Sequence, residues 1–172
     1  WQDNGNSALV FGAGSGQTER LRITSDGQIG VNNTSPDAWH TQYRSIQIYD
    51  GAVLYGSQDD SFVGLGANHF LNTSGDFKYS NTDFASRFYQ VNGGFHFESV
   101  ASGTAGNTFS FTERLRIHSG GQVGIKTDTV FNGALLSIGV GQGVNIPSGE
   151  HIKIAPSANT ITFLDSANNT SD

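Results

Sequence analysis

The sequence predicts an all-β protein, and three observations point to this class. Glycine accounts for 23 of the 172 residues, while strong helix formers are sparse. Short runs of β-branched and aromatic residues alternate with clusters of turn residues, a pattern typical of short strands joined by tight turns. The third observation is an internal repeat, because residues 18–31 and 112–125 both begin with the letters TERLRI and both continue into a glycine turn.

Each copy of the repeat is expected to form a β-hairpin. In the first copy, Leu21 and Ile23 alternate with charged and polar residues before the turn at 25–27, and Ile29 and Val31 resume the alternation after it. In the second copy the turn lies at 119–121. One face of each hairpin therefore carries aliphatic side chains, namely Leu21, Ile23, Ile29 and Val31 in the first copy and Leu115, Ile117, Val123 and Ile125 in the second.

These aliphatic residues are too few in one hairpin to form a core, and an isolated hairpin is only marginally stable in water. Either distant parts of the same chain or other copies of the chain must cover them. Three copies around a three-fold axis would bring the aliphatic residues of each hairpin together, so we predict that all eight form the core of a trimer. The charged residues of the opposite face either pair with one another or are solvated: Glu19, Arg20, Arg22, Glu113, Arg114 and Arg116.

The segment after the first hairpin predicts one short helix over 36–43. Ser35 is suited to the N-cap, Pro36 to the first helical position, and Asp37 complements the helix dipole. The rest of the chain predicts short strands, separated by Gly, Asn and Asp, over 46–48, 52–55, 61–65, 76–80, 86–91, 94–100, 107–111, 134–138, 151–154 and 160–164.

The stretch 87–97 is expected to be a further hairpin, with a turn at Asn92-Gly93. Its alternation predicts Phe88, Phe95 and Phe97 as core residues, with Tyr89 and His96 on the other face. With the repeat, these elements divide the chain into a first hairpin of the shaft at 1–35, a central β module at 36–111, a second hairpin at 112–130 and a C-terminal β module at 131–172.

Composition argues against other classes of protein. The net charge of −6 disfavours nucleic acid and anionic membranes as partners. Apolar runs stay far below the ~18 residues of a membrane helix, so we expect no membrane insertion. Cysteine is absent, which excludes a disulfide scaffold and thiolate metal sites. Because the sequence begins with Trp1, we expect a fragment or a processed product.

The repeated pattern ERLRI-x-S-x-G-x-[IV]-G-[IV], the Ser35-Pro36 pair after its first copy and the segment 101–112 before its second resemble a recurrent module of bacteriophage tail fibres and related trimeric fibre adhesins. The resemblance covers roughly residues 8–130. It implies an intertwined homotrimeric fibre of β-hairpins and small β-sandwich-like modules. It also implies a location on the virion tail, or alternatively on a bacterial surface, and a non-enzymatic role in attachment to a surface polysaccharide or lipopolysaccharide.

In this family an intramolecular chaperone often follows the fibre and cuts itself off near a Ser-Asp pair. The chain ends in Ser171-Asp172, which resembles that junction, with Ser171 as the nucleophile of the cut. The partner lysine of that reaction belongs to the chaperone. These 172 residues are therefore expected to hold no catalytic residue beyond this autocleavage junction.

Aromatic and histidine residues with polar neighbours are the candidate ligand-binding residues, because sugars stack on exposed rings while polar side chains bind their hydroxyls. The alternative is that these residues pack against neighbouring strands. The candidates are Trp39, Tyr43, Tyr55, His69, Tyr79, Tyr89 and His96. The five histidines are dispersed without metal-ligand spacing, so we expect no metal and no cofactor.

Three alternatives to a phage attachment fibre remain open from the sequence. A mosaic trimeric adhesin of a bacterium would have the same architecture. A polysaccharide-degrading tailspike would need two facing carboxylates and would release reducing sugar. A purely structural shaft would bind no glycan.

Overall fold

The computed structural model describes residues 2–3, 8–127 and 136–138, and these residues form strands, turns and loops without a helix. Chain contacts divide the protein into units 1–142 and 143–172, and every described residue belongs to the first. The strands are β1 Gln2–Asp3, β2 Leu9–Ala13, β3 Thr18–Ile23, β4 Ile29–Val31, β5 Tyr43–Ile48, β6 Ala52–Ser57, β7 Val63–Ala67, β8 Phe70–Leu71, β9 Phe77–Lys78, β10 Asp83–Val91, β11 Gly94–Gly103, β12 Thr108–Phe109, β13 Thr112–Ile117, β14 Val123–Ile125 and β15 Leu136–Ile138.

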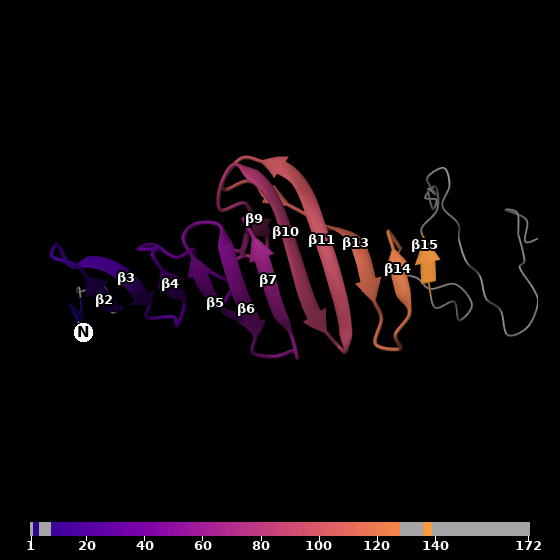
Figure 1. The fold of residues 1–172 in the computed structure, drawn as a ribbon, viewed down its shortest axis with the longest axis horizontal. Helices are drawn as coiled ribbons and strands as arrows, with labels where there is room; N and C mark the ends of the chain where they lie inside the picture. The colour runs from indigo at the N-terminus through magenta and orange to yellow at the C-terminus, as the bar shows by residue number, and fades with distance from the viewer. Residues whose placement is uncertain (1, 4–7, 128–135, 139–172) are drawn as a thin grey trace, which may run out of the picture. The chain divides into compact units, whose positions relative to one another are not determined.

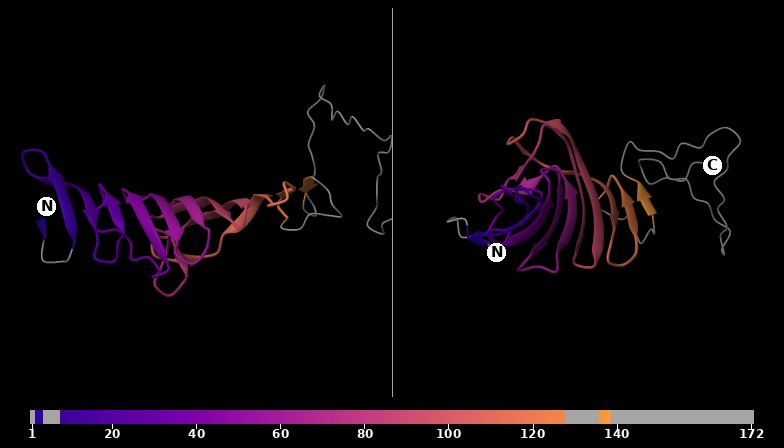
Figure 2. Two further views of the ribbon diagram at one scale, coloured as in Figure 1. Left: turned by 90° about the horizontal axis from the view of Figure 1, so that it is seen from below. Right: turned by 60° about the vertical axis from the view of Figure 1, so that its left-hand side comes forward.

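The strands form two sheets, and the large one follows chain order (Figures 1 and 2). Its order is β1-β2-β3-β4-β5-β6-β7-β10-β11-β13-β14-β15, and the small sheet has the order β12-β9-β8. Neighbours in the large sheet are antiparallel except for β4–β5 and β14–β15, which are parallel. The predicted all-β class is confirmed. In the described part of the chain, no helix is long and apolar enough to cross a membrane.

Both predicted repeat hairpins are confirmed and share one register. Leu21 pairs with Val31 in the first as Leu115 pairs with Ile125 in the second. The turn glycines Gly27 and Gly121 have φ values of +82° and +85°. In each copy the second strand of the hairpin also pairs in parallel with the next strand, β4 with β5 and β14 with β15. The two copies of the repeat therefore share their strand pairing beyond the residues that match in sequence.

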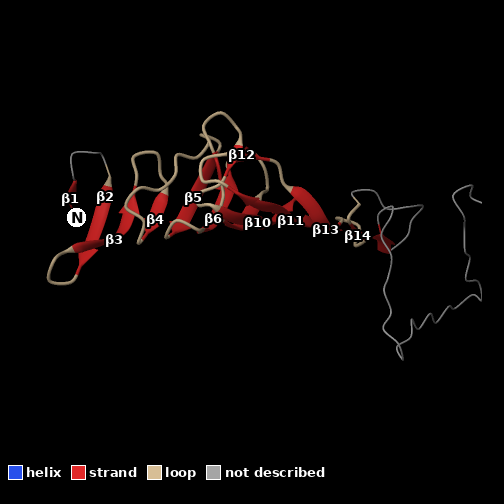
Figure 3. Cartoon of the chain, turned by 90° about the horizontal axis from the view of Figure 1, so that it is seen from above, coloured by secondary structure: helices blue, strands red, loops and turns tan. Residues whose placement is uncertain are grey.

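The two faces of the large sheet are covered unequally. In β6, Val53 and Tyr55 point to one face and are buried, whereas Leu54 points to the other and is 39% exposed. Connecting loops and the small sheet gather over the face of Val53 and Tyr55, which we call the covered face (Figure 3). Its core contains Trp39, Val53 and Tyr55, with Tyr43, Phe62, Phe70 and Leu71 packed against it.

The predicted helix over 36–43 is wrong, because residues 36–40 form an irregular loop and β5 begins at Tyr43. The backbone N–H groups here bond to distant partners instead of to each other. Asp37 N–H donates to Gln47 Oε1, and His40 N–H donates to the carbonyl of Leu71. These bonds hold the loop across the covered face, where it buries Trp39 at 2% exposure.

Most predicted strands occur, with shifted ends. The expected strands 76–80 and 107–111 shrink to the two-residue β9 and β12 of the small sheet, and β2 and β8 were not predicted. The large sheet runs without interruption past residues 35 and 111, where we expected segment boundaries. The predicted strands 151–154 and 160–164 lie outside the described residues.

Gly66 lies beneath the imidazole of His69, and a Cβ at this position would clash with the ring. We therefore expect Gly66→Ala to destabilise the fold by about 1–3 kcal/mol through overpacking. Gly16→Ala is the matched control, since nothing surrounds that position, and it should change stability by less than about 0.5 kcal/mol. Urea unfolding of both variants measures the difference, and equal midpoints would contradict this packing.

Candidate functional site

The first candidate site is the uncovered face of the large sheet, which we call the apolar face. Cα partners in neighbouring strands direct their side chains to the same face. A single row of such partners crosses ten successive strands from β2 to β14, and every member is a large apolar residue. The row is Leu9, Ile23, Ile29, Ile46, Leu54, Leu65, Phe88, Phe97, Leu115 and Ile125.

This apolar face is left partly open to solvent by its own chain. Leu65 is 53% exposed, Ile48 47% and Phe11 45%. All eight residues predicted for the trimer core lie on this face, where they are paired as predicted within the hairpins. The sequence analysis missed the contribution of β5, β6 and β7, although alternating Ile46, Ile48, Leu54 and Leu65 carried the signal. Exposed apolar residues on several neighbouring strands make this face a candidate interaction surface.

The prediction that Phe95 and Phe97 are core residues is wrong for the single chain. They are 39% and 38% exposed on the apolar face, whereas His96 between them is 7% exposed on the covered face. The alternation itself is correct, since Phe88 pairs with Phe97 and Tyr89 pairs with His96. What alternation does not reveal is which face the loops of the same chain will cover.

Two hollows open on the apolar face. The larger, of 510 Å³, has Leu65, Phe88 and Phe97 on its floor and Arg114 among its lining residues. The smaller, of 220 Å³, is lined by Ile29, Ile46, Leu54, Val63 and Arg44 among others.

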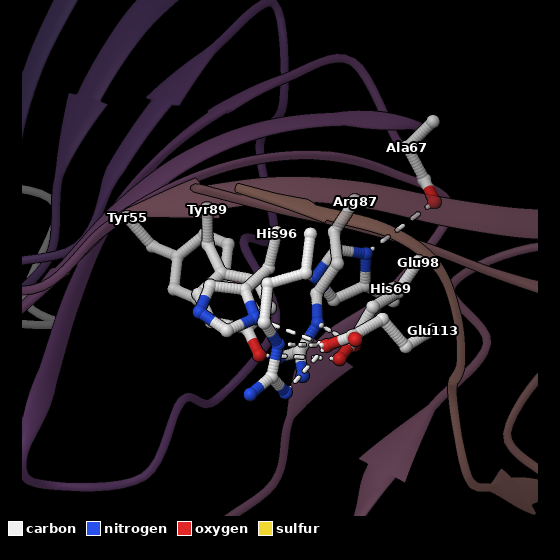
Figure 4. Close-up of polar contacts among 9 residues, drawn as sticks. Tyr55, Ala67, His69, Arg87, Tyr89, His96, Glu98 and Glu113 are labelled. Atoms are coloured by element: carbon white, nitrogen blue, oxygen red, sulfur yellow. Dashed lines mark hydrogen bonds and ion pairs between the residues drawn. The ribbon is translucent and has the colours of Figure 1, made fainter. Parts of the chain in front are cut away.

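The second candidate site is a polar cluster on the covered face, formed by Tyr55, His69, Arg87, Tyr89, His96, Glu98, Glu113 and Arg116. Figure 4 shows seven of these side chains pointing toward one another. They come from β6 and from the neighbouring strands β10, β11 and β13, with His69 entering from the loop after β7. Such a concentration of titratable groups under loops is either a reactive centre or an internal network of ion pairs.

Arg87 is the centre of this polar cluster. Its Nε donates to Glu98 Oε2 at 2.6 Å, and its guanidinium lies 4.5–4.6 Å from the ring centres of Phe77, Tyr89 and Phe111. Because Phe77 belongs to β9, the cation joins the small sheet to the large one. Burial, together with the neighbouring Glu98 carboxylate, raises the pKa of Tyr89 to about 12.

His69 is held in one neutral tautomer by its neighbours. The carbonyl of Ala67, 3.4 Å from Nδ1, only accepts, so Nδ1 carries the proton and Nε2 accepts from the Tyr55 hydroxyl at 3.4 Å. Tyr55 Oη in turn accepts from Arg87. Burial among aromatic rings lowers the pKa of His69 from 6.5 to about 4, and the cation of Arg87 acts in the same direction.

The repeat motif supplies ion pairs on this face. Arg22 contacts Glu19 through two bonds of 2.7 and 2.8 Å, and Arg116 contacts Glu113 at 2.6 Å. Of the two readings left open for these charges, pairing within the chain therefore holds for these four. Glu113 also lies 3.1 Å from His96 Nδ1, and Glu113 is the cross-strand partner of Glu98. Two carboxylates thus lie opposite each other, each neutralised by an arginine.

The ligand-binding candidates lie mostly inside the covered face. Trp39, Tyr55 and His69 are each 2% exposed, Tyr79 is 5% and His96 is 7%. Tyr43 and Tyr89 are partly buried. Trp39 contacts Tyr55 in a tilted arrangement with ring centres 4.8 Å apart, and Tyr89 stacks on His96 at 4.4 Å. In the single chain these rings pack against neighbouring strands, which is the alternative that the sequence analysis left open.

Among the described residues, no group of three or more histidine, aspartate or glutamate side chains is arranged to hold a metal ion. The predicted autocleavage junction, Ser171 and Asp172, lies outside the described residues. In comparisons with known proteins, the chain matches no protein-family model and no curated protein sequence.

The buried neutral His69 predicts a loss of stability in acid. Its folded pKa lies below its unfolded pKa of 6.5, so its contribution is complete above about pH 6.5 and is lost as the pH falls toward about 4. The loss should reach about 3 kcal/mol at most. His69→Phe should flatten urea-unfolding stability over this range, whereas His40→Gln should keep the wild-type slope. An unchanged slope in His69→Phe would contradict this assignment.

Removal of the Arg87 cation should destabilise the fold strongly, because it leaves the largely buried Glu98 carboxylate with the Tyr89 hydroxyl but without its ion-pair partner. We expect Arg87→Met to cost about 3–5 kcal/mol and the double variant Arg87→Met/Glu98→Gln to cost less than the sum of the single changes. Arg20→Met, at an exposed arginine whose side chain donates to Asn32 Oδ1, should cost under about 1 kcal/mol. If the destabilisation of the double variant equals the sum of the two single variants, the energetic coupling between Arg87 and Glu98 is ruled out.

Proposed function

We propose that copies of this chain assemble through the apolar face into a homotrimeric β-fibre that attaches to a bacterial surface glycan. The observation that carries the proposal is the unbroken row of large apolar residues across ten strands. Full burial of an exposed large apolar side chain contributes about 1.5–3 kcal/mol, and each member of the row, about half exposed or less in the single chain, would contribute part of this on assembly.

The resemblance of the ERLRI repeats to fibre modules supports three copies in the assembly. The apolar face by itself requires only that some other copy cover it. Around a three-fold axis, the row of each chain would meet the same row of two others, so that chemically identical residues form successive layers. The ion pairs of Glu19–Arg22 and Glu113–Arg116 would then lie on the outward side of the fibre.

The polar cluster supports a non-enzymatic role. Glu98 and Glu113 are the facing carboxylates that a polysaccharide-degrading tailspike needs, but each is bonded to an arginine, and His96 lies against Glu113. In glycoside hydrolysis one of the two carboxyl groups must donate a proton to the leaving-group oxygen, whereas both carboxylates here are engaged by guanidinium groups. We therefore propose that these carboxylates hold the strands together.

A purely structural shaft is the second candidate function, and the burial of Trp39, Tyr55 and Tyr79 favours it. The two functions differ in one measurable property, since a shaft binds no glycan and an attachment fibre does. A bacterial adhesin and a phage fibre would give the same result, because the assembly would be the same.

The molar mass in solution tests the assembly. Light scattering on a sizing column should give three times 18.3 kDa. Leu65→Asp places a carboxylate at the most exposed member of the apolar row and should release monomers, because several unpaired charges would otherwise be buried at the axis. Thr108→Asp introduces the same charge at an exposed position of the small sheet and should leave the trimer intact. A mass of twice 18.3 kDa would replace the trimer with a face-to-face dimer, and a monomeric wild type would refute the assembly.

A further inference from the structure

A sugar-binding fibre needs exposed rings, and one end of the large sheet provides them. Phe84 is 66% exposed and Tyr49 is 63% exposed, the highest fractions among the large apolar residues of the described chain. Tyr49 follows directly after β5, and Phe84 lies near the start of β10. Register places both at the same end of the sheet, because Ile48, Ala52, Ala67 and Ser86 form one row of Cα partners.

Asn68 holds the two segments in a fixed arrangement. It is 7% exposed and has a φ of +59°, a conformation that asparagine tolerates. Its backbone N–H donates to the carbonyl of Gly51, its Oδ1 accepts from the N–H of Asn81 at 2.6 Å, and its Nδ2 donates to the carbonyls of Asn81 and Phe84, both at 3.0 Å. Asn81 Nδ2 completes the connection by donating to the carbonyl of Asp50 at 2.8 Å. The exposed rings are therefore carried on a preorganised frame, which lowers the entropic cost of binding.

The polar groups around the rings have the chemistry of a neutral sugar site. Asp50, Asn81 and Asp83 are exposed in the same two segments. Carboxylates accept hydrogen bonds from vicinal hydroxyls, and the amide of Asn81 can donate to them as well. Aromatic rings stack on the apolar face of a pyranose. The two carboxylates would repel phosphate, sulfate or carboxylate groups of an anionic polysaccharide.

We infer that the loop cluster of Tyr49, Asp50, Asn81, Asp83 and Phe84 binds an uncharged hexose-containing glycan. This inference rests on the proposed attachment function and specifies its ligand class and its site. Each copy in an assembly would present one cluster, so that weak single contacts are multiplied by avidity. Asn68 is a positioning residue in this arrangement, because it contacts the segments that carry the rings.

The test compares binding of the purified full chain to neutral and anionic glycans on one array. The wild type should bind neutral hexose-containing glycans, and Tyr49→Ala and Phe84→Ala should each weaken the apparent affinity about tenfold or more, with greater losses under multivalent display. Tyr49→Phe should retain binding because it keeps the ring. Asp50→Asn should weaken binding, and its matched control Asp60→Asn, at an exposed turn outside the cluster, should not.

The outcomes separate this site from the proposed function. Neutral-glycan binding that survives in both alanine variants would overturn the site and leave the attachment function standing. Binding of anionic glycans alone would overturn the ligand class. Release of monomers by Phe84→Ala, seen by light scattering, would place Phe84 in the subunit interface and overturn its role here. Absence of any glycan binding by the wild type would overturn both this inference and the attachment, leaving the structural shaft.

Discussion

The register of the large sheet is the constraint on which the rest of the structure depends. From β2 to β14, one row of Cα partners keeps large apolar residues on the same face through every strand pair, although bulges interrupt the register elsewhere in the pairs β2–β3, β10–β11 and β11–β13. A shift of one residue in any pair would transfer an entire set of side chains to the opposite face. Such a slip between β6 and β7 would place Leu65 beside Tyr55 and break both the apolar row and the packing beneath the loops.

The two faces then follow different physical rules. The covered face admits bulky rings only where the sheet offers space, so Gly64 lies below Tyr55 and Gly66 below His69. Arg87 adds an electrostatic bond to this packing, because its guanidinium contacts rings from both sheets as well as Glu98. Among the described residues, no comparable loop covers the apolar face, and several of its side chains stay exposed.

Local chemistry predicted some elements well and misjudged others for identifiable reasons. The hairpins at 18–31 and 112–125 were predictable because alternation and turn glycines act over a few residues. The prediction of a helix at 36–43 was wrong, because the local N-cap signal of Ser35 is outweighed by contacts with distant residues. Trp39 is buried on the covered face, and backbone N–H groups of this segment donate to Gln47 and Leu71. The aromatic candidates could not be separated into exposed and buried sets, since the loops that cover Tyr55 and Tyr79 come from distant parts of the chain.

The sequence by itself determined the all-β class, the repeated hairpin and the division of side chains between two faces, because these depend on spacing and on local turn chemistry. Only the tertiary structure decided which face the chain covers with its own loops. It also joined His69 to Tyr55 and Arg87, and it left Tyr49 and Phe84 exposed on a frame held by Asn68. These contacts join residues far apart in the chain, and their energies depend on the path of the loops, which the alternation of neighbouring residues does not encode.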